Sequence, residues 1–156
     1  MKKTLLSILL SMGILSNATA NDNLYMGIQS SFPSEGFSIK MDTSHKVAVQ
    51  GIFDFIGDET SYALRGLYKF KKEQFYNVYG YGEIGLWSWD KAYYYHESET
   101  VLGFGAGAGI EYDLRGLDSS FIPLFVNAEL NLHMIDFDYY HNDDEFGLGL
   151  GIHYKF

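Results

Sequence analysis

Two segments of the sequence combine histidine with carboxylates in the way that a metal site requires. Each has two tyrosines, then one histidine, then acidic residues, at 94–99 and 139–144. Imidazole nitrogens and carboxylate oxygens are ligands for zinc and other transition metals. The candidate ligands are His96, Glu97, Glu99, His141, Asp143 and Asp144. Exposed tyrosine pairs are equally typical of a partner-binding surface, so we expect no metal and no other cofactor.

Serine and histidine residues offer no complete set for nucleophilic catalysis. A hydrolase needs a serine within hydrogen-bond reach of a base, and a third group that orients the base. Ser44 and His45 are neighbours in a predicted turn with only Asp42 beside them, and His133 and His153 lie on strand faces that carry no serine. We therefore predict no catalytic residue and no enzymatic activity.

The first 20 residues have the pattern of a secretory signal peptide. Two lysines follow Met1, residues 5–15 form an apolar run, and residues 18–20 are Ala-Thr-Ala. A short apolar run followed by small residues is typical of a cleaved signal rather than of an uncleaved membrane anchor. We predict cleavage after Ala20, which leaves residues 21–156 as one domain and changes the net charge from −9 to −11.

Composition excludes several classes of protein. The absence of cysteine excludes a disulfide framework and thiolate metal sites. With 20 acidic and 11 basic residues, the chain lacks the basic face of a nucleic-acid-binding protein, so we expect no nucleic-acid partner. Aromatic residues make up 17% of the sequence, which does not fit a disordered acidic chain.

Alternation of apolar and polar residues with a period of two continues through the rest of the chain. It predicts eight strands and no helix, separated by segments whose glycine, proline, asparagine and acidic residues favour turns. The predicted strands are Leu24–Ser31, Gly36–Met41, Lys46–Ile56, Ser61–Lys71, Phe75–Trp89, Thr100–Leu114, Phe121–Ile135 and Glu145–Phe156. We therefore predict an all-β fold, an eight-stranded antiparallel up-and-down barrel.

One face of each predicted strand is apolar, and the other combines glycine with charge. This pattern fits a soluble barrel of the lipocalin type, with its apolar face inside, and also a transmembrane barrel, with its apolar face towards lipid. Three features favour the transmembrane barrel. First, glycines and charged residues fit the narrow lumen of such a barrel. Second, the apolar faces extend over about 9–11 residues, the length of a strand that crosses a bilayer. Third, aromatic residues gather at the strand ends. These aromatics are Tyr25, Tyr62, Phe70, Tyr76, Trp89, Tyr112, Phe137, Tyr154 and Phe156.

The lumen of an eight-stranded barrel is just filled by side chains, so we do not expect a solute pore. Inward charges must then pair, because an unpaired buried charge is costly. We predict a network that joins Arg65 to Glu83 and, across the lumen, to Glu129, with Lys40 and Glu111 as further members. Structural ion pairing is the first interpretation, and passage of protons or ions is the alternative.

Seven glycines on two predicted strands face the lumen, and the strand between them carries large side chains. The glycines are Gly103, Gly105, Gly107, Gly109, Gly147, Gly149 and Gly151. Because glycine weakens a strand, this arrangement needs a reason. We expect the bare backbones to make room for large inward side chains, and the alternative is a cavity for a small ligand.

The last residues resemble the terminal signal of bacterial outer-membrane barrels, in which a glycine precedes alternating aromatic residues and a final phenylalanine. Gly151, Tyr154 and Phe156 carry this resemblance, while Gly149 stands where the family usually has a polar residue. With its signal peptide and eight strands, the chain resembles the small OmpA/OmpX-like outer-membrane proteins. The resemblance implies a location in the bacterial outer membrane and recognition of the last strand by the barrel-assembly machinery.

Such a location would place four acidic connections outside the cell, at residues 32–35, 57–60, 90–99 and 136–144. Solvation accounts for this charge, and a surface that holds the divalent cations bridging lipopolysaccharide would also use it. We expect a non-enzymatic barrel in contact with outer-membrane lipid and lipopolysaccharide. Its loops 90–99 and 136–144 are the expected site for an extracellular ligand, cation or partner surface. The alternatives are a purely structural membrane element and an enzyme that modifies outer-leaflet lipid.

Overall fold

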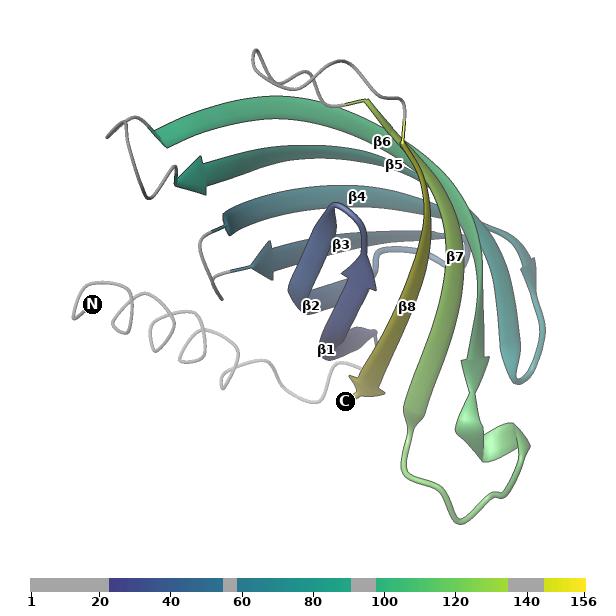
Figure 1. The fold of residues 1–156 in the computed structure, drawn as a ribbon. Helices are drawn as coiled ribbons and strands as arrows, with labels where there is room; N and C mark the ends of the chain where they lie inside the picture. The colour runs from purple at the N-terminus through teal and green to yellow at the C-terminus, as the bar shows by residue number, and fades with distance from the viewer. Residues whose placement is uncertain (1–22, 55–58, 91–97, 135–144) are drawn as a thin grey trace.

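The computed structural model describes residues 23–54, 59–90, 98–134 and 145–156 (Figure 1). The predicted signal peptide lies outside these residues. So do the candidate metal ligands, except Glu99, of which only the backbone is described. Among the described residues, no helix has the length and apolar character needed to cross a membrane.

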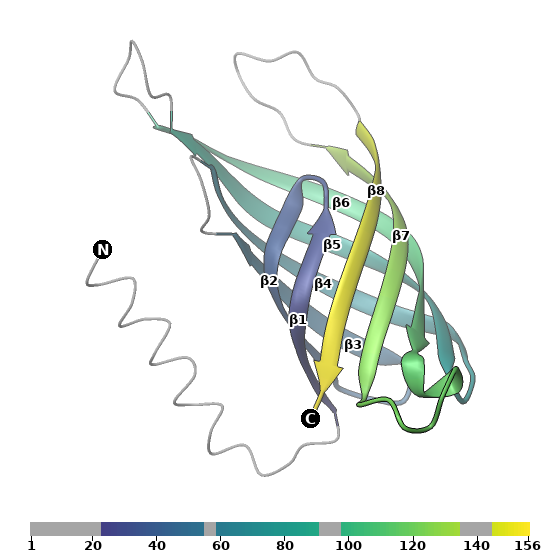
Figure 2. The same cartoon turned by 60° about the horizontal axis from the view of Figure 1, so that its bottom comes forward.

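Eight strands form a closed barrel in which each strand pairs antiparallel with the next and β8 pairs with β1 (Figures 1 and 2). The strands are β1 (Leu24–Ser31), β2 (Ser34–Asp42), β3 (Val47–Asp54), β4 (Glu59–Lys72), β5 (Tyr76–Asp90), β6 (Ser98–Asp113), β7 (Leu124–Met134) and β8 (Glu145–Lys155). The predicted all-β barrel is confirmed. Within the described ranges there is no α-helix, and the one helical element is the short 3₁₀ turn η1 (Leu114–Gly116).

Among the predicted boundaries that differ from the structure, two have a clear physical reason. The expected loop at 32–35 is a tighter turn, because Ser31 pairs directly with Ser34 and only two residues lie between β1 and β2. The strand expected from Phe121 begins at Leu124. Pro123 has no N–H to donate to a sheet, and the N–H of Phe121 donates to the Asp118 carbonyl within the preceding turn.

The barrel is apolar outside and polar inside. On β7 the outward Leu130 and Leu132 are 50% and 40% exposed, whereas Asn131 and His133 are each 2% exposed. The other strands alternate in the same way, which is the reverse of a soluble barrel. The buried positions are therefore mostly polar and charged side chains, with a few glycine, aromatic and aliphatic residues among them.

Tyr25 corrects one detail of the predicted aromatic girdle. Its side chain points into the lumen and only 3% of it is exposed, because β1 places it on the same face as Gln29 and Ser31. Inside, its ring packs edge-on against Phe125 with the ring centres 5.2 Å apart.

The two ends of the barrel differ. The terminal rim is the end at which β1 begins and β8 ends, and it carries the β2–β3, β4–β5 and β6–β7 connections. The loop rim is the opposite end, with the β1–β2 turn and the connections that contain residues 55–58, 91–97 and 135–144. Strands β4, β5 and β6 have 14, 15 and 16 residues, whereas β1, β2 and β3 have 8, 9 and 8. The longer strands extend past the β1–β2 hairpin at the loop rim (Figure 2).

Glycines on β6 and β8 leave room for large side chains from neighbouring strands. A Cβ atom at Gly105 would collide with the imidazole of His133. A Cβ atom at Gly107 would lie 2.6 Å from both the Leu130 carbonyl oxygen and the Tyr81 hydroxyl oxygen. The space beside these glycines is already occupied, which supports complementary packing rather than a ligand cavity.

Replacing Gly107 with leucine should overpack the lumen and lower the free energy of unfolding by about 1–3 kcal/mol or more. Ala106→Leu is the matched control, because Ala106 is the exposed neighbour on the outer face of β6. Its partner on β5 is Gly82, where an added Cβ would meet nothing within 4 Å. Urea unfolding of both variants in detergent measures the difference, and equal stability would reveal free space beside Gly107.

Candidate functional site

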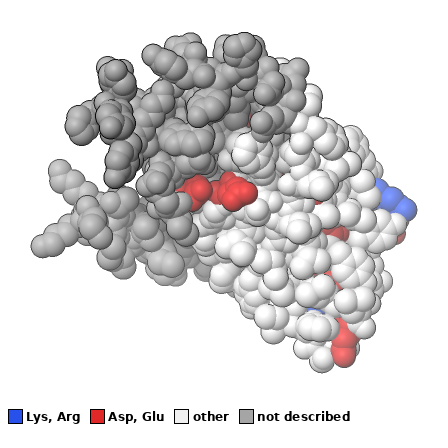
Figure 3. Space-filling view, in the orientation of Figure 1, with Lys and Arg blue, Asp and Glu red and all other residues white. Residues whose placement is uncertain are grey.

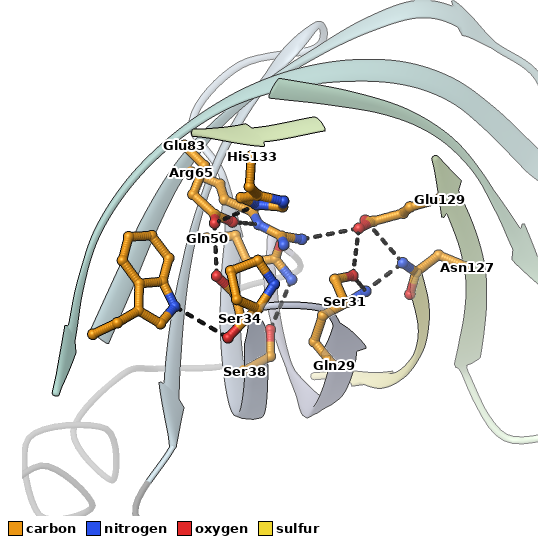
Figure 4. A network of polar contacts seen from close by, with 12 residues as sticks. Gln29, Ser31, Ser34, Ser38, Gln50, Arg65, Glu83, Asn127, Glu129 and His133 are labelled. Carbon is orange, nitrogen blue, oxygen red and sulfur yellow. Dashed lines mark hydrogen bonds and ion pairs between the residues drawn. The ribbon is translucent and has the colours of Figure 1, made fainter. Parts of the chain in front are cut away.

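An arginine and two glutamates occupy the middle of the lumen (Figure 4). Arg65 on β4 pairs in register with Glu83 on β5, so their side chains point inward next to each other. The Nε–H of Arg65 donates to Glu83, and its Nη1 donates to Oε2 of Glu129 at 2.9 Å. All three side chains are at most 1% exposed. One cation therefore faces two carboxylates in a space closed to solvent.

Glu83 has two further polar neighbours, from the other side of the barrel. The Ser34 hydroxyl donates to its Oε1 at 2.6 Å, and His133 Nε2 lies 2.9 Å from the same oxygen. These contacts attach β2 and β7 to the ion pair between β4 and β5. Such donors offset the desolvation of a buried carboxylate.

Glu129 is surrounded in a similar way. It accepts hydrogen bonds from the hydroxyls of Ser31 at 2.8 Å and Tyr79 at 2.6 Å, and from the Asn127 amide at 3.0 Å. Since Ser31 belongs to β1 and Tyr79 to β5, the central cluster joins β1, β2, β4, β5 and β7. Because β4 and β5 lie across the barrel from β1, the cluster holds opposite walls together.

A second set of ion pairs lies nearer the terminal rim. Lys40 on β2 pairs with Glu111 on β6, which also accepts a hydrogen bond from Asn77 at 3.2 Å. Lys69 donates to Oδ1 of Asp42 at 2.6 Å. The five residues of the predicted network thus form two groups in the structure. Arg65, Glu83 and Glu129 make one, and Lys40 and Glu111 make the other.

The β1–β2 turn is attached to the opposite wall near the loop rim. The indole N–H of Trp87 on β5 donates to the Pro33 carbonyl at 3.1 Å, and Trp87 is only 6% exposed. Ser34, the next residue, donates to Glu83. These two hydrogen bonds attach the β1–β2 turn to β5.

Histidines and serines meet inside the barrel, but not in the arrangement of a hydrolase. Ser34 donates to Glu83 rather than to His133, so this histidine is not placed to take the serine proton. His153 Nε2 does lie 2.9 Å from Ser38 Oγ, but its Nδ1 has no hydrogen-bond partner in the described part of the chain. Because both side chains are less than 2% exposed, no substrate reaches this pair in the present structure.

The serines of this network and Gln29 are the members that sequence reasoning missed. Gln29 and Ser31 share a strand face with Tyr25, while Ser34 and Ser38 share one with Lys40. The period of two would have placed these residues in the lumen. Which carboxylates or amides they contact could not be predicted, because polar side chains on the first two strands have several possible partners across the barrel.

The remaining sequence candidates lie on β8 or outside the described residues. Gly151 faces Gln29 and Asn127, whose amide groups occupy the space of a Cβ atom. Tyr154 and Phe156 are 38% and 51% exposed on the outer face, with ring centres 5.1 Å apart. The described residues contain no cluster of three or more histidines and acids suited to a metal ion. The loop candidates, from His96 to Asp144, belong to the segments whose side chains are not described.

Replacing Glu83 with glutamine should lower the free energy of unfolding by about 3–5 kcal/mol, because it removes one partner of a buried cation. Glu73→Gln is the matched control: Glu73 lies 3.5 Å from Lys71 and both are about half exposed, so we expect about 0–1 kcal/mol. Urea unfolding in detergent measures both values. An equal loss of unfolding free energy in the two variants would contradict the burial of Arg65 and its pairing with Glu83.

Comparisons with known proteins give no family for this chain. No family model matches the sequence, and no curated protein matches it. A solved structure that resembles the fold is the attachment invasion locus protein Ail of Yersinia pestis. The TM-score is 0.39 and the sequence identity 16%, over 86% of this chain and 94% of that chain. A likeness of this extent carries no argument about function.

Proposed function

We propose that this protein is an integral outer-membrane barrel whose filled lumen serves as a scaffold for binding by its outer loops. The observation that carries the proposal is the reversed polarity of the barrel. On β8 the outward Leu148 and Leu150 are 74% and 67% exposed, while Arg65 inside is completely buried. A soluble protein rarely exposes so continuous an apolar surface, whereas a bilayer requires one.

The strand lengths agree with this proposal. Strands β4 to β8 have between 11 and 16 residues, and a tilted strand needs about 9–11 to cross the hydrocarbon region. The proposal of export, and of the outer membrane in particular, is based on the sequence of residues 1–20 and on the resemblance of the chain end to an assembly signal. In this orientation the terminal rim faces the periplasm and the loop rim faces the exterior.

The interior supports a scaffold rather than a channel or an enzyme. Side chains fill the lumen and the charges within it are paired, so we propose that solutes do not pass and that no reaction is catalysed there. Binding then falls to loops 90–99 and 136–144, whose acids and tyrosines suit a cation or a partner surface. Lipopolysaccharide and the barrel-assembly machinery are the further proposed partners.

Insertion into phosphatidylcholine vesicles tests the membrane part of this function. We expect the purified protein to migrate differently on gels before and after heating, and vesicles containing the folded form to retain a small trapped dye. A monomer that stays soluble without detergent would contradict the membrane location, and rapid dye loss would contradict the filled lumen.

Titration of the same vesicles with Ca²⁺ tests the loops. Changing Glu97 and Glu99 to glutamine and Asp143 and Asp144 to asparagine should abolish most Ca²⁺ binding without altering heat-dependent migration. A purely structural barrel would bind no Ca²⁺ before or after the change. Analysis of lipid A by mass spectrometry after expression addresses the enzymatic alternative, for which we expect no modified species.

A further inference from the structure

Three lysines gather on one part of the terminal rim. Lys46 precedes β3, and Lys71 and Lys72 end β4, the neighbouring strand. The N–H of Lys69 donates to the Lys46 carbonyl at 2.7 Å, which holds the two strand ends together. All three lysines are exposed. In Figure 3 a small basic patch lies at the right edge of the molecule, where Figure 1 places the β4–β5 turn.

Few acids balance this cluster. Glu73 lies 3.5 Å from Lys71, and Asp42 is engaged by Lys69. Within the described ranges, Lys46 and Lys72 form no ion pair that would neutralise them. The cluster, which we call the lysine edge (Lys46, Lys71 and Lys72), therefore keeps a net positive charge.

The rest of the terminal rim is less basic. Arg115, after β6, is bonded to Asp113, with Nη2 and Oδ2 2.6 Å apart. On the same connection, the N–H of Ser120 donates to Asp118 and holds the pKa of this carboxyl below its usual range, so Asp118 is negative at neutral pH. Apart from Lys69, which pairs with Asp42, and Lys155 at the end of β8, the positive charge of this rim is thus concentrated at the lysine edge.

The lysine edge lies directly below the apolar band of the barrel. A register shift between Lys69 and Lys71 accompanies Phe70, which is 66% exposed on the outer face, next to Tyr68 at 46%. The ammonium of Lys71 lies 5.3 Å from the centre of the Tyr76 ring. Ammonium groups and aromatic rings at the end of an apolar band are typical of the level of lipid headgroups.

We propose that the lysine edge binds the headgroups of anionic phospholipids in the inner leaflet of the membrane. This inference rests on the proposed function, which gives the terminal rim its periplasmic position. A phosphodiester with an uncharged headgroup offers a net negative charge and oxygens that accept hydrogen bonds from ammonium groups. A choline headgroup carries the same phosphate with a compensating cation, so the edge discriminates between the two lipids by charge.

Spin-labelled lipids test this preference. The folded barrel in phosphatidylcholine vesicles is mixed with traces of spin-labelled phosphatidylglycerol or phosphatidylcholine, and the fraction of immobilised label gives the relative association constant. At low salt we expect a several-fold preference for phosphatidylglycerol, since one lysine near an anionic lipid contributes up to about fivefold. Changing Lys46, Lys71 and Lys72 to glutamine should bring the ratio to about one.

Lys155→Gln is the matched control, because Lys155 lies on the same rim at the end of β8 but is only partly exposed, with its ammonium 5.7 Å from the centre of the buried Tyr25 ring. It should leave the preference within about a factor of two. No preference in the unmodified protein, or a preference that survives loss of all three lysines, would overturn the proposal. Equal loss in the Lys155→Gln variant would do the same. Failure to enter vesicles would instead contradict the membrane location, and the same comparison in detergent–lipid micelles would still test the lysine edge.

Discussion

The guanidinium of Arg65 is completely buried in the lumen, and the arrangement of the interior polar side chains depends on pairing this charge. A buried cation without partners would destabilise the fold by several kcal/mol. Glu83 is supplied by the adjacent strand, because the register of β4 and β5 sets it beside Arg65. Glu129 comes from β7, across the lumen, so neutralising the arginine also fixes the separation of opposite walls.

Space is the second requirement, and it follows from the first. Two carboxylates, an arginine and their hydrogen-bond donors occupy more of the cross-section than eight fully substituted strands would leave. Glycines on β6 and β8 provide the room, since the side chains of His133, Tyr81 and Ser31 stand where their Cβ atoms would be. The glycines on the inner face are therefore a consequence of the polar interior. The apolar residues lie on the outer face.

Much of this arrangement could be predicted from the sequence because a strand has only two faces. The period of two assigned Arg65, Glu83 and Glu129 to the lumen, and strand order made Arg65 and Glu83 neighbours. The contacts across the barrel were harder to predict, since they depend on strand tilt and stagger as well as on face. Ser34 reaches Glu83, and Trp87 reaches Pro33, only because the β1–β2 turn contains two residues rather than the expected four.

In the proposed membrane location, the apolar face of the barrel contacts lipid while the charged face is enclosed. The chain has no cysteine, so spin labels can be attached to single cysteines introduced along β7 from residue 126 to residue 132. Collision rates with oxygen, which dissolves in lipid, and with a water-soluble nickel complex then report the surroundings of each position in vesicles. We predict high oxygen access at the positions of Val126, Ala128, Leu130 and Leu132, and low access to both reagents at Asn127, Glu129 and Asn131. High nickel access at the four apolar positions would contradict contact of this face with lipid.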